Sequence, residues 1–164
     1  LAVGLLGLSV SAQAAEWGDL TGRFVFDGKA PAPPKINVNK DTEVFGDKGL
    51  VDESLLVGPD GGLANVVIYV RTRNVAINPE LEKNIKQKVV YDNKDGRFEP
   101  HVLTLWLGKQ TLVLHNSDPV GHNANLQPLG DTGTNPLLPA NSSVEHTFNR
   151  QQSSKRPTRT PQCC

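Results

Sequence analysis

The chain has 164 residues, and its 17 Lys or Arg residues balance its 17 Asp or Glu residues. This length fits one ordinary domain with a single core. Four of the basic residues fall in the last fifteen positions, which contain no acid, so the rest is mildly acidic and shows no basic patch of the kind that binds nucleic acid.

The first fifteen residues predict a secretory signal peptide. Residues 1–11 are an apolar run too short to span a bilayer, and Ala12-Gln13-Ala14 matches the small residues of a cleavage site. A charged start and an initiator Met are missing, so we expect the signal to be clipped at its front. We expect an exported mature protein that starts near Ala15 or Glu16 and has no membrane span.

The mature chain predicts an all-β fold, because short apolar runs alternate with Gly and Pro. A first strand is expected over 20–26, where Leu20, Phe24 and Phe26 share one face before the turn signal Asp27-Gly28. The glycine-rich loop 58–62 predicts a hairpin. Its two strands are expected over 54–57 and 63–70.

Asn78 followed by Pro79 and two acidic residues predicts one or two helical turns. Seven or so short strands favour a β-sandwich. The remaining strands are expected over 88–92, 101–107, 111–115 and 143–148.

His122 is the strongest candidate for a metal ligand. With Asn123 it follows a strand and the turn at Asp118-Pro119, so it is expected on a loop held between strands, where functional residues concentrate. A blue-copper site needs a second imidazole, a thiolate and a weak axial ligand. The terminal stretch 155–164 offers thiols but no His.

The other candidate ligands have structural alternatives. His115 is expected on the face of its strand opposite Leu112 and Leu114, where a surface role is as plausible as a ligand role. Cys163 and Cys164 are adjacent and terminal, which excludes a disulfide framework within the domain. Cys163 remains a candidate thiolate for a metal, although both cysteines also fit a tail that does not match the domain.

Three segments resemble the plastocyanin-like cupredoxins of exported bacterial proteins often labelled methylamine utilisation proteins. They are Asp92-Asn-Lys-Asp-Gly-Arg-Phe-Glu-Pro-His-Val102, His115-Asn-Ser-Asp118 and Gly121-His-Asn123, and the opening 18–28 is also similar. The resemblance covers about residues 17–154. It implies a cupredoxin-like Greek-key β-sandwich of eight strands, with a type 1 copper site that carries single electrons between periplasmic partners.

Carried over by residue, the resemblance implies that His122 is the first copper imidazole and that Asn123 tethers the ligand loops. It implies a supporting role for His101, which matches the Pro-His-Val position of the family. Gly96 stands where many relatives have Cys.

The chain departs from the family after Ser154, where relatives continue with a Cys…His-Pro-Trp-Met loop and a closing strand. We therefore expect a cupredoxin-like domain over 16–154 that lacks its last strand, a basic tail over 155–164 produced by a frameshift or gene fragmentation, and an incomplete copper site.

The sequence contains no Gly-x-Ser-x-Gly elbow, no His-Glu-x-x-His motif and no phosphate loop, so we expect no enzyme. The acidic stretch 41–53 could steer a cationic redox partner or bind calcium weakly, although such a stretch is more often a solvated loop. Two alternatives stay open at this point: a metal-free β-sandwich that serves as a binding or adhesion module, and a fragment without a function of its own.

Overall fold

The computed structural model describes residues 17–72 and 74–148. The expected signal peptide, the tail 155–164 and Cys163 lie outside the described residues. The described part is β-rich, with two short α-helices and one 3-10 helix, and none of these is long or apolar enough to cross a bilayer. The elements are α1 (Thr42–Phe45), η1 (Gly46–Lys48), α2 (Pro79–Lys83), β1 (Lys88–Lys94), β2 (Arg97–Glu99), β3 (Thr111–Asn116), β4 (His122–Asn123), β5 (Leu137–Leu138) and β6 (Ser142–His146).

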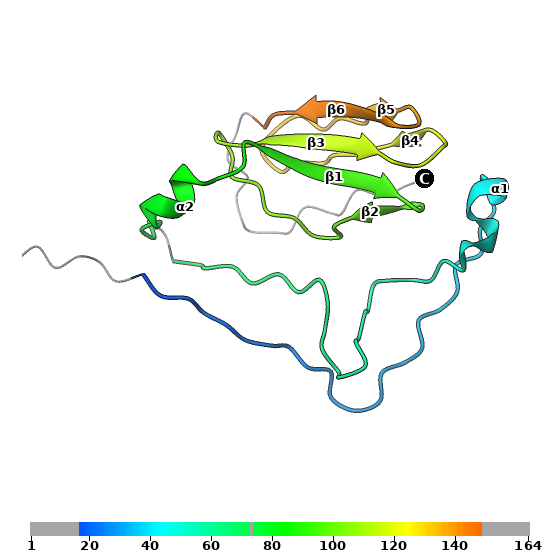
Figure 1. Ribbon diagram of the computed structural model, residues 1–164, viewed down its shortest axis with the longest axis horizontal. Helices are drawn as coiled ribbons and strands as arrows, with labels where there is room; N and C mark the ends of the chain where they lie inside the picture. Colours follow the sequence, from blue (N-terminus) through cyan, green and yellow to red (C-terminus); the bar gives the residue numbers. More distant parts are fainter. Residues whose placement is uncertain (1–16, 73, 149–164) are drawn as a thin grey trace, which may run out of the picture.

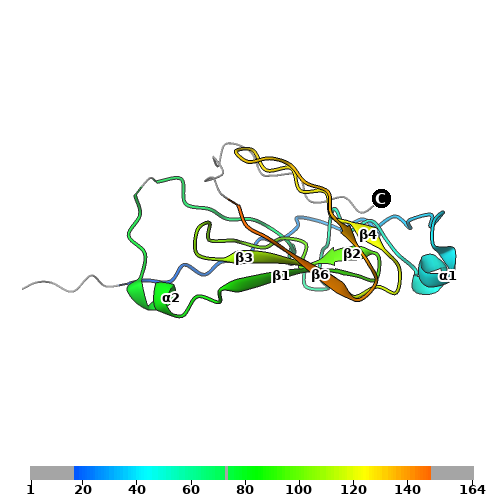
Figure 2. The same ribbon diagram turned by 90° about the horizontal axis from the view of Figure 1, so that it is seen from above.

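A four-stranded mixed sheet with the order β2-β1-β3-β6 forms the body of the described part (Figure 1). Its two central strands, β1 and β3, run parallel, with partners from Lys88↔Thr111 to Asn93↔Asn116. The outer strands β2 and β6 are antiparallel to their neighbours. β4 and β5 form a separate antiparallel pair, and Figure 2 shows the chain between them on one side of the larger sheet.

The core lies against one face of the four-stranded sheet. Because side chains alternate along a strand, Leu112 and Leu114 of β3 point to the same face as Tyr91 of β1, and all three are buried. The Tyr91 ring stacks on Phe98 with 4.7 Å between ring centroids. The same cluster contains Ala124, Leu126 and Leu138, with Leu103, Leu105 and Phe148 packed against it.

The structure confirms the helix predicted after Asn78 and three of the predicted strands. The Asn78 side chain caps α2 by accepting a hydrogen bond from the backbone N–H of Glu80 at 3.0 Å. The predicted strands 88–92, 111–115 and 143–148 correspond to β1, β3 and β6. The structure thus shows the predicted β-rich class. The Greek-key sandwich is a more specific arrangement and stays a prediction.

Three strand predictions are wrong. Residues 20–26 contribute only an isolated bridge between Val25 and Gly62, and residues 101–107 are irregular. The hairpin turn at 58–62 closes as expected, with a bridge from Val57 to Leu63, but the ladder does not continue along 66–70. A strand needs a neighbour as well as suitable residues, and these apolar segments have no continuous ladder partner among the described residues.

Burial raises the pKa of Tyr91 to about 12 from the ordinary value of 10.0. Folding therefore disfavours ionisation of this phenol, so its contribution to stability is fully present below pH 10 and is lost as the pH rises toward 12. We expect urea unfolding to show a larger loss of stability across this range for the wild type than for Tyr91→Phe. Tyr69→Phe, at an exposed position, is the control, and equal losses in the wild type and Tyr91→Phe would contradict the prediction.

Candidate functional site

The imidazole of His122 is buried at the start of β4. Its side chain is 7% exposed, and Nε2 lies 3.0 Å from Oδ2 of Asp118, four residues earlier. The ring also contacts Phe45 at the end of α1, with 5.8 Å between ring centroids. One ring is thus held between a loop carboxylate and an aromatic side chain from a distant part of the chain.

Asp118 joins His122 to the turn between β1 and β2. Its Oδ1 accepts a hydrogen bond from the backbone N–H of Asp95 at 2.7 Å, and its Oδ2 accepts one from the N–H of Gly96 at 2.9 Å. Asp95 and Gly96 have φ angles of 55° and 74°, a left-handed turn that directs both N–H groups to one side. Hydrogen bonds to an ionised acceptor are stronger than neutral ones, so this carboxylate is a firm anchor for the loop.

Asn116 holds the loop from its other side. This fully buried amide donates through Nδ2 toward the carbonyl oxygens of Val120, Leu138 and Pro139 at 2.8, 3.0 and 3.0 Å. Its Oδ1 accepts the backbone N–H of Asp118 at 3.0 Å. The amide therefore connects the end of β3 to β5, the strand that pairs with His122.

A third set of contacts fixes the loop to β1. The hydroxyl of Ser117 donates to Oδ2 of Asp92 at 2.7 Å, and the N–H of Ser117 lies 3.1 Å from Oδ1 of Asp92 and 2.9 Å from the carbonyl oxygen of Asn93. The side chains of three consecutive residues, 116–118, thus all form hydrogen bonds with other parts of the chain. The loop that carries His122 is preorganised by these contacts, as a ligand-bearing loop needs to be.

The structure does not bring His115 or His101, the two other predicted ligands among the described residues, to His122. His115 points to the face of β3 opposite the core, where its Nδ1 lies 2.7 Å from Oγ of Ser143. Nε2 of His101 is within hydrogen-bond distance of Oε2 of Glu53, whose other oxygen forms an ion pair with Arg97. That cluster ties the segment around residue 53 to β2.

Asn123 reaches toward the segment before β5, with 3.5 Å between its Nδ2 and the carbonyl oxygen of Asn135. Cys163 lies outside the described residues. Within residues 17–72 and 74–148, no group of three or more His, Cys, Asp or Glu side chains is arranged to hold a metal ion. The described residues therefore fit one ligand of a type 1 copper site and do not fit the whole site.

No family model, no curated protein and no solved structure matches this chain. The resemblance to cupredoxins thus enters the functional argument as a proposal.

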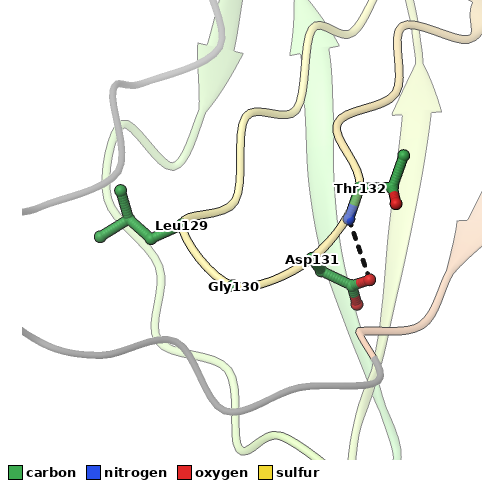
Figure 3. Close-up of a pocket in the computed structure, with 4 residues that line it drawn as sticks. All are labelled: Leu129, Gly130, Asp131 and Thr132. Atoms are coloured by element: carbon green, nitrogen blue, oxygen red, sulfur yellow. Dashed lines mark hydrogen bonds between the residues drawn. The ribbon is translucent and has the colours of Figure 1, made fainter.

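A surface hollow over the chain between β4 and β5 is a weaker candidate site (Figure 3). It is lined by Leu129, Gly130, Asp131 and Thr132, and Oδ1 of Asp131 accepts the backbone N–H of Thr132 at 3.0 Å. Among the described residues that line the hollow, Asp131 is the one titratable side chain. These described residues do not supply the several converging polar groups that a small-molecule site needs.

The sequence singles out His122 but does not indicate the residues that contact it. It marks Asp118 as a turn residue and as part of the cupredoxin-like segment 115–118, and it gives no sign of Phe45. The four-residue spacing between Asp118 and His122 across a tight turn was the available signal for their contact. No local signal connects Phe45 with a residue so far along the chain.

Proposed function

We propose that this chain is an exported, cupredoxin-like copper-binding and electron-transfer protein in which His122 is the anchoring imidazole. The observation that carries the proposal is the buried pair of His122 and Asp118. Histidines that bind metals usually donate their second ring N–H to a carboxylate or carbonyl, which orients the ring and increases its basicity. The pair in this chain has that arrangement, at the position where the family resemblance implies a copper ligand.

The proposal includes a Greek-key sandwich for the complete fold and a periplasmic redox protein as partner. Copper, when bound, supplies a centre that takes up and releases one electron at a time. The chain's own contribution is to exclude water from the ring of His122 and to hold its orientation through Asp118. Cys163 is the proposed thiolate donor, and His101 and Asn123 have supporting roles.

A copper titration of the full chain tests this function. We expect uptake of one equivalent without an intense blue colour, because a single assured imidazole does not form a type 1 site. His122→Asn should weaken binding by about 10-fold or more, whereas His115→Ala, on the opposite face, should leave it unchanged. Repeating the titration with Cys163 and Cys164 both changed to Ser measures the contribution of the thiols.

Equal copper affinity in the wild type and a folded His122→Asn protein would contradict the proposal, and so would the absence of any uptake. Circular dichroism establishes that each variant is folded before its affinity is compared. An intense blue colour in the wild type would instead show that the site is more complete than the described residues indicate.

One observation favours a second candidate, a metal-free binding module. The five consecutive apolar residues of 66–70 are between 43% and 72% exposed. Contiguous exposed apolar surface often marks a site of interaction. A cooperative fold that takes up no copper would favour this candidate over the first.

A further inference from the structure

We propose that residues 34–53, here called the cover loop, form a lid that opens as one unit and controls the access of solvent and solutes to His122. The cover loop contains α1 and η1 and lies at the end of the sheet where β2 and β4 are found (Figures 1 and 2). It reaches His122 through Phe45, and it reaches His101 through Glu53. The inference goes beyond the proposed function, because it concerns the imidazole itself and applies with or without copper.

Hydrogen bonds within the cover loop close its base. The backbone N–H of Ile36 donates to the carbonyl oxygen of Leu50 at 2.9 Å, and the N–H of Asp52 donates to that of Pro34 at 2.8 Å. The chain between them, residues 37–49, has the length and the closely spaced ends of an Ω-loop. Because these hydrogen bonds join parts of the same loop, the loop can move away from the sheet with them intact.

Apolar side chains of the cover loop pack beside His122. Phe45 is 5% exposed, and its ring centroid lies 5.8 Å from that of His122 with 42° between the ring planes. Phe45 and Leu50 also lie over Gly96 in the β1–β2 turn, where an added Cβ would be 3.4 and 3.5 Å from them. The cover loop thus shields both the imidazole and the turn whose N–H groups bind Asp118.

Ion pairs join the cover loop to the sheet. Lys48 pairs with Asp95 in the β1–β2 turn, and Glu53 pairs with Arg97 of β2. The cation is on the loop in one pair and on the sheet in the other, so the two surfaces are complementary in charge. The side chains of Lys48 and Asp95 are 36% and 46% exposed, more than those of Arg97 and Glu53. A pair with this exposure contributes little to stability and weakens as salt is added, so the loop is held closed by a contact that is easily broken.

Opening of the cover loop as one unit exposes two histidines together. His122 loses its contact with Phe45, and His101 loses Glu53, whose Oε2 lies 2.5 Å from Nε2 of His101. His146 is at the opposite end of the sheet, where β6 ends beside the start of β3, and its Nε2 is buried. A local opening at the cover loop leaves this end of the sheet closed, so His146 reports unfolding of the sheet itself.

The experiment is acylation of the full chain by diethyl pyrocarbonate, an electrophile that reacts with neutral imidazole nitrogen. Mass spectrometry of the digested protein gives the rate at each histidine, expressed relative to His115 on the outer face of β3. The Debye length falls from about 30 Å in 0.01 M salt to about 3 Å in 1 M salt. Across this range we expect the rates at His101 and His122 to rise together by about two- to fivefold, with no change at His146.

Two variants test the contacts of the cover loop separately. Lys48→Gln should raise both rates by about two- to fivefold at low salt, whereas Lys88→Gln, which breaks an ion pair within the sheet, is the matched control and should change neither. Phe45→Ala should raise the rate at His101 as well as at His122, by about tenfold or more, because loss of one contact releases the whole loop. Circular dichroism establishes that each variant is folded.

Rates at His101 and His122 that respond neither to salt nor to Lys48→Gln would overturn the inference, since the loop would then be a fixed part of the fold. A rise at His122 alone would also overturn it, because the loop would not move as one unit. A parallel rise at His146 would show that the whole sheet unfolds. The salt series uses the unaltered chain, so it decides the inference even where Phe45→Ala does not fold.

Discussion

Replacing Leu114 with Ala is expected to lower the free energy of unfolding by about 2–5 kcal/mol. Leu114 is fully buried on β3, one of the two central strands of the sheet. It belongs to the cluster that contains Tyr91, Phe98 and Leu138. Truncation removes three carbon atoms from this cluster and leaves a cavity that close-packed neighbours fill only in part. Urea unfolding followed by circular dichroism measures the effect.

Leu137→Ala is the matched control, since this neighbour of the buried Leu138 is 62% exposed. The same truncation there should change the unfolding free energy by less than about 0.5 kcal/mol. Similar losses for both variants would show that the cluster around Leu114 is not the core of the molecule.

Alternation along the sequence predicts β1, β3 and β6, three of the four strands of the sheet, but neither β2 nor the pairing of the strands. The pattern in 111–115 correctly separates Leu112 and Leu114 from His115, because side-chain direction in a strand is a local property. That β3 runs parallel to β1 and antiparallel to β6 depends on contacts between distant segments. The apolar run 63–70 shows most clearly that composition alone does not determine a strand. Its residues predict one, but no continuous ladder partner occurs among the described residues.

The candidate site was predictable only where it depends on side-chain direction along a strand, which is a local property. Extending the alternation of Leu112 and Leu114 by two residues places Asn116 on the core face, so its burial could have been anticipated. A buried amide must then find hydrogen-bond partners, which is the role observed. The hydrogen bonds of Asp118 to the β1–β2 turn could not be predicted from the sequence, because they depend on how that turn packs against the loop before β4.

Replacing Asn116 with Asp is expected to destabilise the protein by about 3–5 kcal/mol at neutral pH, the range for a buried charge left without a partner. The two side chains have nearly the same shape, so the effect is electrostatic. An oxygen would replace Nδ2, which faces three carbonyl oxygens within 3.0 Å. Urea unfolding measures the loss, and Asn141→Asp in the exposed turn before β6 is the control, with an expected change below about 0.5 kcal/mol.

The pH dependence gives Asn116→Asp a second test. Burial among carbonyl oxygens favours the protonated form of the new carboxyl group, so its pKa in the folded state should be raised above the unfolded value of about 3.9. The stability gap to the wild type should therefore be small near pH 4 and widen as the pH rises. A gap that is independent of pH would show that the substitution acts through shape.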